Sequence, residues 1–272
     1  MEHIVLAYDA SPGAEAALDW VSWRIQNEAA VVHLLFVTNP LWAEKTQATR
    51  NLHAARDQLR RHNPALTVHL LLLDGRKIPT LTRAALDADL LVMGASQRAR
   101  APHQGSAALP LRVANRVICP TVLVPEGWTS GSGEPRVMVG IDDDSSSDTA
   151  AAFAADEATR LHAPLHLVHA WKTLPSAPGR VRDQVSGDAE IEDAHRRLLN
   201  EVAARIRTGW PGLPLELTLV HDNPVSALAT AARHADVTVI GSHRRGAITA
   251  VILGSVAQDL SRDLHSPLCI VP

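Results

Sequence analysis

Two glycines near the end of the sequence have the spacing of a phosphate-binding loop. Gly241 follows the apolar stretch VTVI, and Gly254 precedes Ser255 and VAQDLSRDL, which has helical spacing. Glycine lets a backbone turn sharply and expose its amide, and the free N–H groups at a helix start attract an anion. We therefore expect Ser255 to cap the helix and the loop to hold phosphate. The alternative is that Gly241 is only a turn and Ser255 only a cap.

Three consecutive carboxylates follow an apolar stretch at the start of the second half of the chain. Asp142, Asp143 and Asp144 come directly after the strand-like residues VMVGI. Side by side, they would repel a triphosphate unless Mg²⁺ lay between them, so Mg²⁺ is a candidate companion ion. The simpler interpretation, which we favour, is that Asp144 caps the following helix.

Other combinations of reactive residues do not form a recognisable catalytic or metal site. His162, His166 and His169 are close in sequence, but Pro164 interrupts any helix that would align the first two. Residues 166 and 169 face opposite sides of a strand. The sequence contains no GxSxG, HExxH or Walker motif. We therefore expect no catalytic residue and no metal ligand.

The composition excludes several classes of partner. The net charge of −3 and the 3% aromatic content leave neither a basic field nor a stacking surface for nucleic acid. No apolar run approaches a membrane span of about 20 residues, and the N-terminus lacks the basic and apolar regions of a signal peptide. Cys119 and Cys269 have no CxxC spacing. We expect a cytoplasmic protein with reduced thiols that binds neither nucleic acid nor membrane.

The sequence consists of two copies of one unit. HIVLAYDASPGAEAALDW aligns with RVMVGIDDDSSSDTAAAF, and ADLLVMGASQ aligns with ADVTVIGSHR. These matches divide the chain into a first domain over residues 1–126, a linker over 127–135 and a second domain over 136–272. The second copy is longer by about 14 residues, which we assign to the Pro- and Gly-rich stretch Lys172–Asp188.

Each copy alternates short apolar runs with segments of helical spacing. In the first copy the apolar runs are HIVLAY, VVHLLFV, LTVHLLL, DLLVMG and TVLVP. Such strands, separated by helices, indicate a parallel sheet covered on both faces. We predict an α/β fold with two doubly wound, Rossmann-like five-stranded sheets in tandem, and ligands beyond the carboxyl ends of strands one, two and four. Trp20, Trp23 and Phe153 have helical spacing and are predicted core residues.

Both copies resemble the universal stress protein domain, and the resemblance covers nearly the whole chain. Nucleotide-binding members of that family have a signature of Gly, two residues, Gly, nine residues, then Gly followed by Ser or Thr. Gly241 and Gly254–Ser255 fit this spacing, but Arg244 replaces the middle Gly. The resemblance implies an ATP site in the second copy, with Asp142 and the backbone of Ala170 near adenine and ribose. The residues that it implies for this site are Asp142, Ala170, Gly241, Ser242, His243, Arg244, Gly254, Ser255 and Val256.

The first copy departs further from the signature. It keeps Asp9 and Gly94, but Gln97 takes the place of the middle Gly, and Ala107–Ala108 takes the place of Gly-Ser. We therefore expect little nucleotide binding in the first copy. In the second copy, Arg244 either lays a guanidinium beside the phosphates or fills the pocket, and we favour retained binding.

Three functions agree with these features. The first, which we favour, is an ATP-binding regulatory module of the stress response without fast turnover. The second is a nucleotide-free member of the family that acts through protein–protein contacts. The third is a slow Mg²⁺-dependent ATP hydrolase in which Asp142–Asp144 hold the ion. The apolar last strands, TVLVP and PLCIVP, need cover. The resemblance suggests that the two domains pair through these strands and that the chain forms a homodimer.

Overall fold

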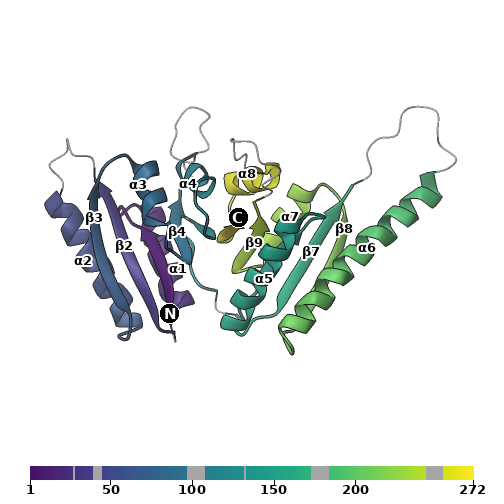
Figure 1. The fold of residues 1–272 in the computed structure, drawn as a ribbon, viewed down its shortest axis with the longest axis horizontal. Helices are drawn as coiled ribbons and strands as arrows, with labels where there is room; N and C mark the ends of the chain where they lie inside the picture. The colour runs from purple at the N-terminus through teal and green to yellow at the C-terminus, as the bar shows by residue number, and fades with distance from the viewer. Residues whose placement is uncertain (27, 39–44, 97–107, 132, 173–183, 243–253) are drawn as a thin grey trace. The chain divides into compact units, whose positions relative to one another are not determined.

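The computed structural model resolves the chain into two compact units. It describes residues 1–26, 28–38, 45–96, 108–131, 133–172, 184–242 and 254–272. Unit 1 comprises Met1–Ser132 with Ser242–Pro272, and unit 2 comprises Gly133–Gly241. Figure 1 draws the elements of both units. The end of the second repeat is thus counted with unit 1, and the domain boundaries expected from the sequence remain a prediction.

Unit 1 contains a parallel sheet in the order β3-β2-β1-β4-β5. Its strands are β1 (Glu2–Ala7), β2 (Ala30–Thr38), β3 (Thr67–Asp74), β4 (Leu90–Ala95) and β5 (Thr121–Pro125). Its connecting helices are α1 (Pro12–Arg24), α2 (Lys45–His62), α3 (Lys77–Ala84) and α4 (Ala108–Ala114). Because β1 lies between β2 and β4, the winding reverses beside β1, as expected for a doubly wound sheet.

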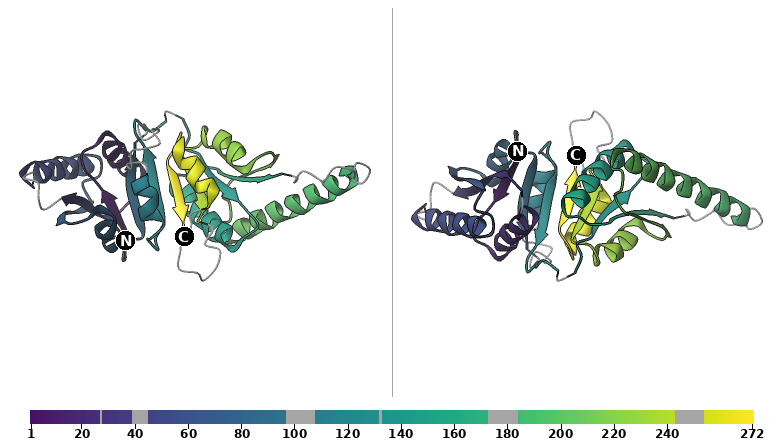
Figure 2. Two further views of the ribbon diagram at one scale, coloured as in Figure 1. Left: turned by 90° about the horizontal axis from the view of Figure 1, so that it is seen from above. Right: turned by 90° about the horizontal axis from the view of Figure 1, so that it is seen from below.

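Unit 2 repeats this arrangement with four parallel strands in the order β9-β6-β7-β8. These strands are β6 (Val137–Ile141), β7 (Leu165–Trp171), β8 (Leu215–His221) and β9 (Val237–Gly241). The helices are α5 (Ser145–Arg160), α6 (Gln184–Gly209) and α7 (Pro224–Ala232). Figure 2 shows α6 running alongside β7 and β8, which it contacts. The predicted α/β class and parallel pairing are confirmed in both repeats.

The last two elements of the chain belong to unit 1. They are α8 (Ser255–Arg262) and β10 (Leu268–Val271). β10 pairs antiparallel with β5, with Leu268 opposite Leu123 and Cys269 opposite Val122. All four β10 residues are buried. The two apolar strands that end the repeats therefore cover each other, which is the strand pair that the resemblance suggests.

Polar side chains begin the helices where the sequence offers them. Ser11 caps α1 by accepting a hydrogen bond from the Ala14 N–H, and Asp144 caps α5 by accepting one from the Ser146 N–H at 3.0 Å. Such caps satisfy backbone donors that have no partner within the helix. The expected capping role of Asp144 is confirmed.

Some details of the elements differ from the prediction. Trp20 is fully buried, but Trp23 is only half-buried, with its ring edge-on to Trp128 at 5.6 Å, and Phe153 is also partly exposed. Part of the extra stretch in the second repeat is helical, because α6 already begins at Gln184. This makes α6 26 residues long, whereas α2 has 18. None of the helices in the described part of the chain combines the length and the apolar character needed to cross a bilayer.

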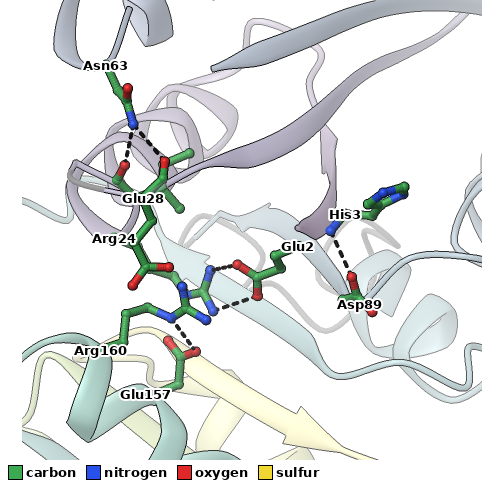
Figure 3. Close-up of polar contacts among 9 residues, drawn as sticks. Glu2, His3, Arg24, Glu28, Asn63, Asp89, Glu157 and Arg160 are labelled. Atoms are coloured by element: carbon green, nitrogen blue, oxygen red, sulfur yellow. Dashed lines mark hydrogen bonds and ion pairs between the residues drawn. The ribbon is translucent and has the colours of Figure 1, made fainter. Parts of the chain in front are cut away.

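A buried charge pair ends the first helix of unit 1. The Arg24 side chain is 0% exposed, and its two terminal nitrogens donate to the two carboxylate oxygens of Glu2 at 2.8 and 2.9 Å (Figure 3).

The backbone that follows this helix is held by Asn63, which donates to the carbonyl oxygens of Ile25 and Glu28, at 2.8 and 2.9 Å. These bonds satisfy carbonyl groups left beyond the end of the helix. The hydrogen bonds from Asn63 explain why α1 stops at Arg24, although the apolar pattern of the sequence continues beyond this residue.

Candidate nucleotide site

Three residues expected at the site share one edge of the unit 2 sheet. β6 pairs in parallel with β7 on one side and with β9 on the other, so the carboxyl ends of these strands lie side by side. Asp142 directly follows β6, Ala170 is the last residue but one of β7, and Gly241 ends β9. This edge is where doubly wound sheets bind ligands. Ala170 is thus inside its strand rather than just after it.

Close packing, rather than a turn, explains the glycine at position 241. A Cβ atom there would lie 2.4 Å from Ser146 Oγ and 2.9 Å from the Ser146 carbonyl oxygen. Gly241 is not among the glycines with positive φ in the described chain. The expectation that Gly241 mainly permits a sharp turn is therefore wrong. Its missing side chain lets the first turn of α5 approach the end of β9.

The backbone after β6 holds Asp142 in a fixed geometry. Its carboxylate accepts a hydrogen bond from the Asp143 N–H at 2.8 Å, and its own N–H donates to Ser147 Oγ at 2.8 Å. The Asp144 carboxylate instead accepts from the hydroxyl of Ser146, at 2.6 Å. The carboxylates of Asp142 and Asp144 therefore have different partners, because Asp144 binds the start of α5. A half-buried carboxylate such as Asp142 can accept hydrogen bonds from sugar hydroxyls.

A pair of histidines lies next to these carboxylates. His169 Nδ1 donates to the Ile141 carbonyl oxygen at 2.7 Å, which leaves its Nε2 to accept from His195 Nδ1 at 2.8 Å. Burial and His169 lower the pKa of His195, against an opposing effect of Asp143 and Asp142. His195 also stacks on Trp171, with ring centroids 5.1 Å apart. The ring is therefore neutral at neutral pH, and it fixes α6 against the end of β7.

The remaining expected site residues belong to the last part of the chain. His243 and Arg244 lie outside the described residues. Ser242 is 3% exposed, and its hydroxyl has no hydrogen-bond partner in the structure as described. Gly254 is the N-cap of α8 and makes no side-chain cap, so Ser255 is the first helical residue and not the cap that the sequence predicts. Val256 follows in the same turn.

The corresponding edge of unit 1 has different polar groups. A cavity of about 80 Å³ opens there, and its lining combines apolar side chains with the polar residues Tyr8, Asp9, Ser11 and Lys77. The Lys77 ammonium lies 3.3 Å from the Asp9 carboxylate. Burial tends to raise the pKa of Asp9, but the hydrogen bonds from Ser11 and the charge of Lys77 outweigh it and hold that pKa below its ordinary value. The first repeat thus keeps the carboxylate but neutralises it with a lysine.

Sequence reasoning missed the contacts that join distant segments. The Asp9–Lys77 pair and the His169–His195 bond connect residues 68 and 26 positions apart. Neither pair has a motif of its own, and only the register of neighbouring elements could have suggested them. His166 and His169, considered as a metal cluster, bond to different partners, since His166 Nε2 lies 2.7 Å from Thr218 Oγ1. Within the described ranges, no group of three or more His, Cys, Asp or Glu side chains could hold a metal ion.

Comparison with known proteins supports the family resemblance noted in the sequence, over nearly the whole chain. The model of the universal stress protein family matches twice, over residues 1–125 and 135–272. Universal stress protein Rv2623 of Mycobacterium tuberculosis is 26% identical, over 98% of this chain and 95% of its own. Universal stress protein Rv2005c of the same organism is 28% identical, over 75% of this chain and 69% of its own.

Solved structures support the fold. A universal stress protein from Archaeoglobus fulgidus matches 99% of this chain and 97% of its own, with a TM-score of 0.70 and 16% identity. A putative universal stress protein from Pseudomonas aeruginosa matches 100% of this chain with a TM-score of 0.64. The family model matches the chain twice, and the curated relative Rv2623 aligns with it almost from end to end. The chain therefore belongs to the universal stress protein family and carries two of its domains in tandem.

Proposed function

We propose that this chain is a regulatory module that binds one adenine nucleotide, ATP, through its second repeat. The observation that carries the proposal is the shared edge of β7, β6 and β9. There, a carboxylate (Asp142), a strand backbone (Ala170) and a glycine (Gly241) lie at the carboxyl ends of three adjacent parallel strands. A nucleoside needs an acceptor for its ribose hydroxyls and backbone groups for its base, and this edge offers both.

The groups proposed for the phosphates suit an anion. α8 begins after Gly254, which brings no side chain that would occupy the first N–H groups of the helix. Free N–H groups and the helix dipole favour negative charge at such a start. The buried hydroxyl of Ser242, which lacks a partner in the described structure, is a further candidate donor. Mg²⁺ is the proposed companion ion of ATP, and Asp142 and Asp143 are its candidate ligands.

We place the nucleotide in the second repeat because the first lacks the necessary groups. In the sequence, Ala107–Ala108 stands where the second repeat has Gly254–Ser255. In addition, Lys77 already occupies the carboxylate of Asp9. These two differences argue for one nucleotide per chain. Arg244, in the loop before α8, is proposed to add a guanidinium next to the phosphates.

The first experiment asks whether nucleotide is bound at all. Mass spectrometry of gently purified protein should detect ATP or ADP, and calorimetry should give about one site per chain with micromolar affinity. Arg244→Ala should weaken ATP about five- to thirtyfold and leave adenosine almost unchanged, because only ATP has phosphates to contact. Absence of ATP binding in the parent and its appearance in Arg244→Gly would mean that Arg244 closes the pocket. The protein would then act through protein–protein contacts.

A further inference from the structure

A second cavity lies in unit 2, at the amino ends of the strands and thus at the edge opposite Asp142. Its volume is about 170 Å³. Met138, His166 and Glu216 stand in direct register on β6, β7 and β8, so their side chains form one row on one face of the sheet. Arg136 comes two residues before Met138 and therefore shares this face. The row supplies the floor and one rim of the cavity.

The cavity has an apolar interior and a polar rim. Met138 is 1% exposed, and the cavity is also lined by Pro164, which precedes β7, and by Ala231, near the end of α7. The rim carries the exposed side chains of Arg136 and Glu216. Ligand pockets typically combine such an apolar lining with a few convergent polar groups. A cavity of about 150 Å³ accommodates a benzene-sized molecule, so this one can hold a small apolar side chain.

The two rim charges are of opposite sign and do not satisfy each other. In the described structure, neither the Arg136 guanidinium nor the Glu216 carboxylate makes a hydrogen bond or an ion pair, although both line the same cavity. The Arg136 backbone is held separately, since its N–H donates to Asp236 Oδ2 at 2.9 Å. A ligand that carries both charges at one end could therefore bridge the rim.

The histidine in the middle of the row, His166, adds no charge at neutral pH. Burial lowers the pKa of His166, with Glu216 opposing and Arg136 reinforcing this effect. The ring is tied to Thr218 Oγ1 at 2.7 Å. His166 is thus a neutral wall between the two charges. The exposed ring of His234, just beyond α7, lines the opposite side.

We propose that this cavity binds a small zwitterion with an apolar side chain, that is, an apolar α-amino acid. Its carboxylate would pair with Arg136, its ammonium with Glu216, and its side chain would rest on Met138 and Pro164. A guanidinium recognises a carboxylate through two parallel hydrogen bonds, which fixes the orientation of the ligand. The proposal is independent of nucleotide binding, because the two sites use opposite ends of the strands.

The first repeat provides an internal comparison. At the positions that correspond to Arg136, His166 and Glu216, it carries His3, His33 and His69. The rings of His3 and His33 are 6.3 Å apart, and those of His33 and His69 are 5.2 Å apart. This row has no carboxylate or guanidinium. We therefore expect one amino-acid site per chain and not two.

The test uses the full-length protein and three ligands in titration calorimetry. L-leucine should bind at one saturable site with a Kd of about 1 mM or below. Isocaproic acid lacks the ammonium group of leucine, and isoamylamine lacks its carboxylate. Each of these two ligands should therefore bind about tenfold more weakly than leucine. Arg136→Gln and Glu216→Gln should each weaken leucine about tenfold as well. Arg207→Gln, a change at another exposed arginine in unit 2, is the matched control and should leave leucine binding unchanged.

Two results of these titrations would contradict the amino-acid site. No saturable heat with leucine up to about 10 mM would overturn the proposal. Isocaproic acid that binds as tightly as leucine would also overturn it, because Glu216 would then play no part. Since the three-ligand comparison uses the unmodified protein, it stands even if a variant fails to fold. A titration with ATP in the same samples keeps the two sites distinct, since leucine should neither compete with ATP nor be displaced by it.

Discussion

The two repeats keep the same glycine at the end of the fourth strand but differ in the polar groups around it. A Cβ atom on Gly94 would lie 2.1 Å from the carbonyl carbon of Gly13, and one on Gly241 would lie 2.4 Å from Ser146 Oγ. In both repeats the start of the first helix, α1 or α5, is packed against this glycine. The neighbouring carboxylates differ, because Asp9 is paired with Lys77 and Asp142 with the backbone of Asp143. Close packing against a helix start fixes the glycine, while the polar side chains at this edge of the sheet can change.

The first helix of each repeat shows the same principle for a buried charge. Arg24 in α1 and Glu157 in α5 occupy corresponding positions, and they are 3% and 2% exposed. Arg24 makes two hydrogen bonds to Glu2, and Glu157 forms an ion pair with Arg160, whose Nε lies 3.5 Å from Glu157 Oε1. Both repeats therefore bury a charge at this position, with opposite sign. A partner must accompany such a charge, because burying it alone is very unfavourable.

The largest effect is expected from removing a carboxylate that binds a buried charge. Glu2→Ala removes the two hydrogen bonds that the Glu2 carboxylate accepts from the enclosed Arg24 guanidinium and should lower the free energy of unfolding by about 3 kcal/mol. The matched control is Asp148→Ala, which removes the exposed partner of Arg205 at 2.6 Å and should cost less than about 1 kcal/mol. Urea denaturation of both variants checks the difference. Equal losses would mean that burial does not govern the contribution of these pairs.

An added methyl group should distinguish the two conserved glycine contacts. Gly94→Ala meets the backbone of Gly13, which cannot move aside, and should cost about 2–3 kcal/mol. Gly241→Ala meets mainly the Ser146 side chain and should cost about 1–2 kcal/mol. Adding Ser146→Gly should recover part of the loss at Gly241, as measured by thermal unfolding. A loss at Gly241 that is as large as that at Gly94 and is not recovered would contradict the packing argument.

The smallest effect is a loss of stability in mild acid that involves the histidine row of the first repeat. Burial, together with His69 and His3, lowers the pKa of His33 below its ordinary value of 6.5. The unfolded chain therefore takes up this proton more readily than the folded one. Stability is full above about pH 6.5 and is lost as the pH falls through the lowered pKa. His33→Gln should flatten the pH dependence of urea unfolding between about pH 7 and pH 5. An unchanged slope would show that His33 does not contribute.

Much of the fold could be predicted, because it depends on local patterns that recur in both repeats. The apolar runs give all five strands of the first repeat in their correct order, and Asp144 caps its helix as expected. The start of α8 was less predictable, because a serine after a glycine can be either the cap or the first helical residue. Here Gly254 is the cap and Ser255 follows. The end of α1 also depends on a distant residue, Asn63, which binds the carbonyl groups beyond the helix.

The candidate sites were predictable only in part. The edge that carries Asp142, Ala170 and Gly241 follows from the alternation of strands and helices. The amino-end cavity was not recognised, although the alignment of the repeats already pairs Arg136 with His3 and Glu216 with His69. What was missing is the register across β6, β7 and β8, since side chains meet on a sheet face only when the strands are correctly aligned.

Titration of ATP into matched aspartate variants of the full chain tests the central claim, that the second repeat holds the nucleotide. Asp142→Asn weakens the acceptor proposed for ribose and should reduce affinity about tenfold, whereas Asp9→Asn, at the corresponding position of the first repeat, should leave both affinity and stoichiometry unchanged. Melting curves of both variants control for folding. The account predicts about one ATP per chain and a loss only in Asp142→Asn. Two sites per chain, or a loss of binding only in Asp9→Asn, would contradict it.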